Sequence, residues 1–234
     1  MASSAAPEAA FLYDGQHSVG IPQDVTHVQV DPSVKVIGDR AFDRCTLLRS
    51  VKLYEGLEHI QRLAFAGCTS LESIAIPSTV QVVGEEAFRA CKKLRSVKLC
   101  EGLERIEDGA FGGCTSLEVI DIPSTIQVVG EEAFHGCTKL RSVELCEGLE
   151  RIDRGAFAGC TSLEQITIPS TVNFIGPEAF KNSRGLVFKF SSGMEKFLKE
   201  VSLREWLVAD GLFCNLSVGI PSWFDAVFQC ALKL

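Results

Sequence analysis

An alanine–phenylalanine pair recurs every 23 residues along most of the chain. Its phenylalanines are Phe42, Phe65, Phe88, Phe111, Phe134, Phe157 and Phe180. A cysteine follows three residues after each of the first six, and a leucine follows three residues later. A fixed period of this length is typical of stacked repeats, because one such unit cannot bury its own apolar face. The spacing therefore predicts an elongated array in which residues 23 apart become neighbours.

Each copy contains one strand-like segment and one segment that resembles a helical turn. Residues 96–99 alternate polar and apolar side chains, which predicts a short strand, and its copies should stack into a parallel sheet. Residues 84–91 (GEEAFRAC) begin with acids and continue with an inward-facing Ala-Phe pair. We predict a short helical turn there, on the opposite side of the array, with the acids near its positive end.

Two kinds of repeat alternate, so the true sequence period is 46 residues. One kind carries Ile-Pro-Ser-Thr after the strand, and the other carries Glu-Gly-Leu-Glu. The residue after each repeated leucine also alternates in sign, through Arg49, Glu72, Arg95, Glu118, Arg141 and Glu164. At strand spacing these side chains would form a ladder of opposite charges. We favour this structural interpretation, in which the ladder fixes the register, over a charged binding site.

The ten cysteines fall largely on two repeat positions. Copies in neighbouring coils lie about 5 Å apart, within reach of a disulfide. Side chains at equivalent positions point the same way, however, and that fits bridge geometry poorly. We interpret the cysteines as buried thiols that act as core residues. Many free thiols, and a start (MASSAAPEAAF) without a secretory signal, lead us to expect a cytoplasmic location.

Composition and motifs exclude several classes of function. The net charge of −7 argues against binding to nucleic acid or to an anionic membrane surface. There is no run of eighteen apolar residues, so we expect no membrane span. No HExxH, Gly-rich phosphate loop or Cys-x-x-Cys occurs, and the four histidines are scattered. We therefore expect no enzymatic activity, no cofactor and no metal site.

The repeated residues carry a family resemblance. The pattern Ala-Phe-x-x-Cys-x-x-Leu-x-x-Ile-x-Ile-Pro-x-x-Val-x-x-Ile-Gly resembles the BspA-like class of leucine-rich repeats over roughly residues 25–190. The resemblance implies an α/β solenoid with a parallel sheet on the concave side and short helical turns on the convex side. It also implies binding of macromolecules rather than catalysis, since members include bacterial surface adhesins. It transfers no binding residues.

The chain divides into three predicted parts. Residues 1–24 form an irregular leader and cap, residues 25–190 form a solenoid of about seven units, and residues 191–234 form a helical segment. Residues 25–30 alternate and could be the first strand. Residues 194–208 have the pattern of an amphipathic helix, and a second helix is expected to start at Ser222. This segment either caps the last coil or docks a partner or a second copy through Trp206, Trp223, Phe224 and Phe228.

The exposed positions of the concave sheet are the candidate binding face. The predicted binding residues are Arg49, Lys52, Arg95, Lys98, Asp121 and Glu144. Their drift from basic to acidic would orient an elongated, charged protein partner, although a surface that binds nothing could drift in the same way. We expect a non-enzymatic protein–protein interaction scaffold. The alternatives are a secreted or surface recognition protein, with a glycan at Asn215, and an engineered or orphan repeat protein without an evolved ligand.

Overall fold

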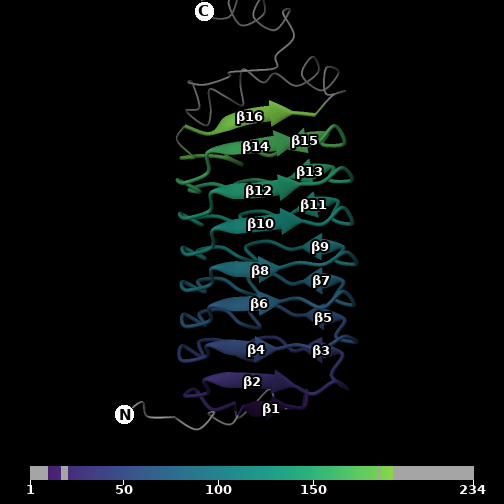
Figure 1. The fold of residues 1–234 in the computed structure, drawn as a ribbon, viewed down its shortest axis with the longest axis vertical. Helices are drawn as coiled ribbons and strands as arrows, with labels where there is room; N and C mark the ends of the chain where they lie inside the picture. Colours follow the sequence, from purple (N-terminus) through teal and green to yellow (C-terminus); the bar gives the residue numbers. More distant parts are fainter. Residues whose placement is uncertain (1–9, 17–20, 184, 192–234) are drawn as a thin grey trace, which may run out of the picture.

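The chain forms a parallel β-solenoid. The computed structural model describes residues 10–16, 21–183 and 185–191. Figure 1 shows the coils stacked as a column, with the longer strands along one side and the shorter strands along the other. Every pair of neighbouring strands is parallel. Residues 23 apart are therefore neighbours through most of the stack, as the spacing predicts.

The longer strands form two sheets that share one side of the column. The first sheet has the order β1-β2-β4 and the second the order β16-β14-β12-β10-β8-β6. We call their exposed side the broad face; it is the sheet that the sequence analysis placed on the concave side. Its strands are β1 (Phe11–Tyr13), β2 (His27–Val30), β4 (Ser50–Lys52), β6 (Ser73–Ala75), β8 (Ser96–Lys98), β10 (Val119–Ile122), β12 (Ser142–Leu145), β14 (Gln165–Ile168) and β16 (Val187–Phe190).

The shorter strands form a seven-stranded sheet that the sequence analysis did not predict. We call its exposed side the narrow face. Each strand has two residues, and from β3 to β13 the second of them is buried. A two-residue strand is too short to show a period, so the pattern cannot reveal it. The strands are β3 (Val36–Ile37), β5 (His59–Ile60), β7 (Val82–Val83), β9 (Arg105–Ile106), β11 (Val128–Val129), β13 (Arg151–Ile152) and β15 (Phe174–Ile175).

The predicted helical turns are wrong. No helix occurs among the described residues, so the fold is a β-solenoid and not an α/β one. In the segment 84–91, Glu86 and Ala90 have φ angles of +54° and +58°, which a right-handed helix cannot contain. The N–H of Glu86 donates to the carbonyl of Asp108 at 2.8 Å, and that of Ala90 donates to Gly112 at 2.7 Å. These backbone groups thus join one coil to the next instead of closing helical turns.

The remaining expectations on the two ends differ in outcome. β1 lies within residues 1–24, so the first strand precedes the one expected at 25–30. The expected helices and the residues Trp206, Trp223, Phe224 and Phe228 lie outside the described residues. The division at residues 24 and 190 remains a prediction.

The repeated phenylalanines form a continuous ladder inside the column. From Phe42 to Phe180, successive ring centroids are 5.0 to 5.4 Å apart and the rings are within 2° to 8° of parallel. Tyr13 meets the lower end of the ladder edge-on at 5.1 Å, and Phe188 meets the upper end at 5.1 Å. Such pairs add about 0.5–1.5 kcal/mol each beyond the area they bury. The ladder therefore contributes strongly to holding the coils in register.

The cysteine column lies beside this ladder and is part of the core. The thiols of Cys68, Cys91, Cys114, Cys137 and Cys160 each donate to the carbonyl of a phenylalanine in the coil before, at 3.2 to 3.3 Å. In the seventh copy the hydroxyl of Ser183 makes the same bond to Phe157 at 3.2 Å. Burial raises the pKa of Cys45 to about 11. The eight described cysteines are free, and the six of this column are buried, which confirms their interpretation as core thiols, whereas Cys100 and Cys146 are only partly buried.

Candidate binding surfaces

The broad face presents a column of side chains at the third position of each strand from β2 to β16. The register pairs Gln29 with Lys52, Ala75 with Lys98, Asp121 with Glu144 and Thr167 with Lys189. A second column pairs His27 with Ser50, Ser73 with Ser96, and Val119 with Ser142. Most side chains of the second column are serines, which are shorter than the charged side chains of the first column.

All six residues predicted to bind a partner are exposed. The structure brings Lys52, Lys98, Asp121 and Glu144 into the first column, while Arg49 and Arg95 lie directly before β4 and β8. The Nζ atom of Lys52 lies 4.8 Å from the centroid of the Tyr54 ring. The role of these residues in binding stays a prediction.

The predicted charge ladder is in register but does not form ion pairs. The N–H of Arg95 donates to the carbonyl of Glu72 at 2.9 Å, so these positions are neighbours in the stack. None of the ion pairs between described residues joins two of the six ladder side chains. Their charged groups stay in solvent, because an exposed pair gains little from contact.

Asp121 and Glu144 face one another in register on β10 and β12. Like charges directly opposite each other destabilise a sheet. Their field also reaches the nearby Cys146, whose pKa is raised first by burial and then by Glu144, Glu101 and Asp121. Neither carboxylate takes part in an ion pair with another described residue. The basic Lys98 holds the neighbouring position of the column on β8, where Ser96 pairs with Val119, so its positive charge reduces this repulsion without forming an ion pair.

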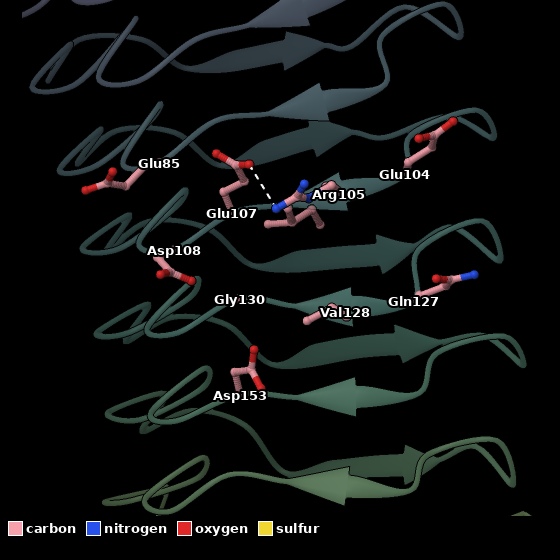
Figure 2. Close-up of a pocket in the computed structure, with 10 residues that line it drawn as sticks. Glu85, Glu104, Arg105, Glu107, Asp108, Gln127, Val128, Gly130 and Asp153 are labelled. Atoms are coloured by element: carbon pink, nitrogen blue, oxygen red, sulfur yellow. Dashed lines mark ion pairs between the residues drawn. The ribbon is translucent and has the colours of Figure 1, made fainter.

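The narrow face carries a groove that the sequence analysis did not identify. Its volume is about 490 Å³, and it crosses β9 and β11. Figure 2 shows Arg105 near its centre with acidic side chains around it. It is lined by Glu85, Glu104, Arg105, Ile106, Glu107, Asp108, Gln127, Val128, Gly130 and Asp153. No sequence signal marks it, because its residues come from four successive repeats at positions that vary.

The fold already uses most of the charges in this groove. The guanidinium of Arg105 pairs with Glu107 at 3.3 Å (Figure 2), and that of Arg151 pairs with Asp153 at 2.8 Å. Glu85 pairs with Arg62 from the preceding coil at 3.2 Å. The carboxylate of Asp108 accepts the N–H of Glu131 at 2.8 Å. The groove is therefore weakly suited to a cationic ligand, which would have to displace these partners.

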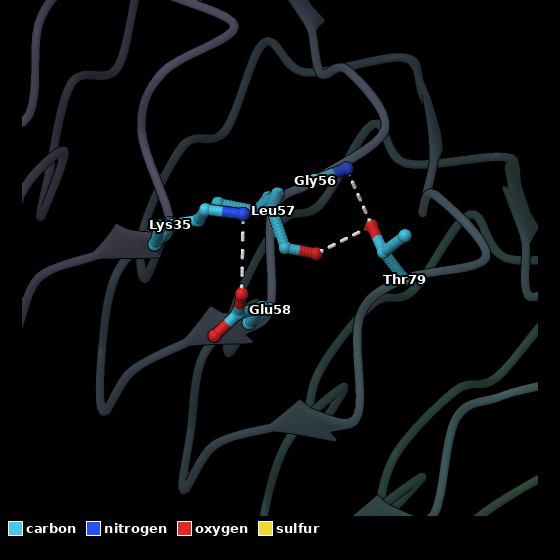
Figure 3. Close-up of polar contacts among 5 residues, drawn as sticks. All are labelled: Lys35, Gly56, Leu57, Glu58 and Thr79. Carbon is cyan, nitrogen blue, oxygen red and sulfur yellow. Dashed lines mark hydrogen bonds and ion pairs between the residues drawn. The ribbon is translucent and has the colours of Figure 1, made fainter.

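The corner after the broad face explains why two kinds of repeat alternate. The hydroxyl of Thr79 donates to the carbonyl of Leu57 at 2.7 Å and accepts the N–H of Gly56 at 2.8 Å (Figure 3). Beside it, the carboxylate of Glu55 accepts the hydroxyl of Ser78 at 3.0 Å. These bonds lower the pKa of Glu55, the hydroxyl bond most.

The same arrangement recurs twice along the stack. Glu101 accepts the hydroxyl of Ser124 at 3.0 Å, and Glu147 accepts that of Ser170 at 2.9 Å. We call each Glu–Ser–Thr set a corner clasp. A clasp needs one repeat of each kind, so the 46-residue period follows from hydrogen bonding between consecutive coils. An ion pair between Lys35 and Glu58, at 3.2 Å, lies near the first clasp (Figure 3).

The fold defines the class of protein: a β-solenoid built from short repeats, with an exposed sheet on two sides. A family model described as the BspA type leucine-rich repeat region matches residues 22–139 and 58–187, in six copies. These matches span well over half of the chain. The chain belongs to the BspA-type leucine-rich repeat family, as the resemblance of its repeats implied.

Solved structures of bacterial proteins share this fold. A leucine-rich repeat protein from Eubacterium ventriosum is 26% identical with a TM-score of 0.62; the match covers 66% of this chain and 42% of that protein. One from Bacteroides ovatus is 24% identical with a TM-score of 0.53, covering 72% and 56%. The chain thus spans about half the length of these two proteins.

A search of curated proteins finds no match to this sequence. In the part of the chain that the structure describes, no membrane-crossing helix occurs.

Proposed function

We propose that this chain is a non-enzymatic scaffold that binds a protein partner through the broad face. The observation that carries the proposal is the set of exposed charges on that face, which the described fold leaves without ion-pair partners. Lys98, Asp121 and Glu144 lie on adjacent strands of one sheet, and none of them takes part in an ion pair with another described residue. Charges arranged in this way favour association with a partner of complementary pattern.

The architecture supports the same proposal. Repeat solenoids bind through extended surfaces that several units build together. The broad face offers such a surface, since its outward residues come from at least six coils held at fixed spacing by the phenylalanine ladder. A partner would meet a preformed surface, which lowers the entropy that binding costs.

We extend the proposal to a cytoplasmic location. The support is the chemistry of the cysteine column, whose thiols are buried, free and hydrogen-bonded to carbonyls. Intact mass under non-reducing conditions, together with fractionation of the full-length product, tests this point. Native bridges or a surface location would instead favour the recognition-protein alternative.

The test of the proposed function is a pull-down from cells that express the natural protein. The tagged chain is compared with the variant Lys52→Glu/Lys98→Glu, which reverses the basic half of the broad face. We expect partners bound by the wild type to be lost at least tenfold in the variant.

Lys92→Glu/Lys93→Glu is the matched control. It makes the same change in net charge at two exposed residues that follow Cys91 and lie outside β8. We expect it to keep the wild-type partners. Equal binding by wild type and Lys52→Glu/Lys98→Glu would reject the basic half of the broad face as the site.

A further inference from the structure

From β4 to β14, the charges of the broad face divide into two halves of opposite sign, and Lys189 on β16 lies beyond this division. The half from β4 to β8 has a net charge of +3, from four basic residues and one acid: Arg49, Lys52, Glu72, Arg95 and Lys98. The half from β10 to β14 has a net charge of −3, from four acids and one basic residue: Glu118, Asp121, Arg141, Glu144 and Glu164. All ten side chains are exposed.

We propose that the broad face binds a second copy of this chain, face to face and antiparallel. This inference rests on the proposed function of that face and names the partner. The two-fold axis would run along the strand direction and pass between β8 and β10. Each copy would then set its basic half against the acidic half of the other, as an isologous contact requires.

The register of the sheet fixes which residues meet. An axis along the strands keeps each column opposite itself and reverses the order of the coils. β8 therefore faces β10 of the second copy, so that Arg95 meets Glu118 and Lys98 meets Asp121. β6 faces β12 and β4 faces β14, which bring Glu72 opposite Arg141 and Arg49 opposite Glu164. Each charge that meets another charge in this arrangement therefore meets one of opposite sign. Lys52 and Glu144 meet the uncharged residues Thr167 and Ala75.

Neighbouring arrangements are disfavoured by the same charges. In a parallel pair of copies, with the two-fold axis along the stack, each coil would face its own equivalent, so that the basic half meets the basic half and the acidic half meets the acidic half. In an antiparallel pair shifted by one coil, Arg49 or Arg95 faces Arg141, and Glu72 faces Glu118 or Glu164. Like-charge contacts of this kind suppress wrong partners and wrong registers. The alternating ladder would thus select the register between two copies.

The centre of the face suits close approach. Ser96 would lie opposite Val119, and Ser73 opposite Ser142, so small side chains occupy the middle of the contact. The side chain of Val119 is 48% exposed in the single chain and would be covered at the axis. Six strands at about 4.8 Å spacing span only about 25–30 Å. An interface this small and polar is expected to be weak and to respond to salt.

The test is a charge swap followed by sedimentation velocity of the full chain, at about 1–100 μM. We expect the wild type to dimerise, and both Arg95→Glu/Lys98→Glu and Glu118→Lys/Asp121→Lys to weaken dimerisation at least tenfold. A mixture of the two variants should restore the dimer, because each reversed half then meets its complement. A chain that carries all four substitutions should dimerise on its own. Lys92→Glu/Lys93→Glu is the matched charge control and should dimerise as the wild type does.

Two results would overturn the inference. One is a wild type that stays monomeric throughout this concentration range. The other is a dimer that both reversed variants keep, which would place the contact elsewhere, for example in residues 191–234 if they dock a second copy. Neither result decides the proposed function. The pull-down tests that function separately, because it measures whether Lys52→Glu/Lys98→Glu loses a partner other than this chain.

Discussion

The two faces of the column differ in whether their charged side chains form ion pairs. On the narrow face, basic side chains pair with acids, as in Arg62–Glu85 at 3.2 Å and Arg154–Glu131 at 3.5 Å. On the broad face, Lys98, Asp121 and Glu144 form no ion pair with another described residue. The same repeat therefore supplies one surface whose charges serve the fold and another whose charges remain available to a partner.

This difference separates stability from binding. Residues of the core and the corner clasps should affect the free energy of unfolding and leave binding unchanged in a folded chain. Residues of the broad face should affect binding and leave the free energy of unfolding nearly unchanged.

The largest expected effect on stability lies in the phenylalanine ladder. Phe111→Ala removes a buried ring that stacks on Phe88 and Phe134, at 5.3 and 5.4 Å. We expect a loss of about 3–5 kcal/mol in the free energy of unfolding, measured by denaturant titration. Val119→Ala on the broad face is the control and should cost less than about 0.5 kcal/mol. Similar losses in both variants would contradict the assignment of the ladder as the core.

A smaller loss in the free energy of unfolding is expected at Gly130, where two coils approach closely. A Cβ atom on Gly130 would lie 2.8 Å from the backbone of Glu107, so Gly130→Ala should cost about 1–3 kcal/mol. Gly38 occupies the same repeat position in the first coil, where the nearest atom is Gln61 Oε1 at 3.9 Å. Gly38→Ala is therefore the matched control and should be tolerated. Denaturant titration of the two variants measures the difference, and equal costs would refute the close approach.

The corner clasp should contribute less to the free energy of unfolding than the close approach at Gly130. Thr125→Val removes the hydroxyl that donates to the carbonyl of Leu103 at 2.6 Å. We expect a loss of about 1 kcal/mol in denaturant titration. Thr115 makes only a 3.4 Å contact with the carbonyl of Lys92, so Thr115→Val should cost clearly less. A larger effect at Thr115 would argue against the clasp.

The clasps should also make stability depend on pH. Hydrogen bonds from Ser78 lower the pKa of Glu55 below its ordinary 4.5. The stability that they add is present above the unfolded pKa and is lost as the pH falls through the folded pKa. Between about pH 6 and pH 3, the melting temperature of Ser78→Ala should therefore fall less than that of the wild type. Ser73→Ala is the control, and a wild-type pH profile in Ser78→Ala would contradict the cause assigned here.

The sequence predicts the stacking well because its signal is carried by buried residues. The phenylalanine, cysteine and leucine positions repeat since each must fill the same space in every coil. The candidate binding residues followed from the same register, which places Asp121 beside Glu144 as expected.

The helical turns were predicted wrongly because the prediction rested on the composition of one copy, which does not show the backbone conformation of the segment. The segment 84–91 has the acids and the Ala-Phe pair of a helical turn, yet Glu86 and Ala90 are left-handed. The next copy has glycine at both equivalent positions, Gly109 and Gly113, and both have a positive φ. Glycine at these positions is a sequence signal for a left-handed backbone. Comparing repeats column by column, instead of one copy at a time, would have found these positions. The ion-pair state of each face depends on side-chain geometry and could not be derived from spacing.

The most direct test of the contrast between the faces is the free energy of unfolding of two matched charge reversals. Arg62→Glu/Arg154→Glu turns two ion pairs between coils of the narrow face into repulsions. We expect it to lower the free energy of unfolding by about 0.5–2 kcal/mol. Lys52→Glu/Lys98→Glu makes the same change in charge on the broad face. It removes the exposed contact of Lys52 with Tyr54 and sets a carboxylate beside Asp121, so we expect a smaller loss, of about 0.5 kcal/mol. An equal or greater loss in the second variant would show that the broad-face charges serve the fold, and would contradict the account.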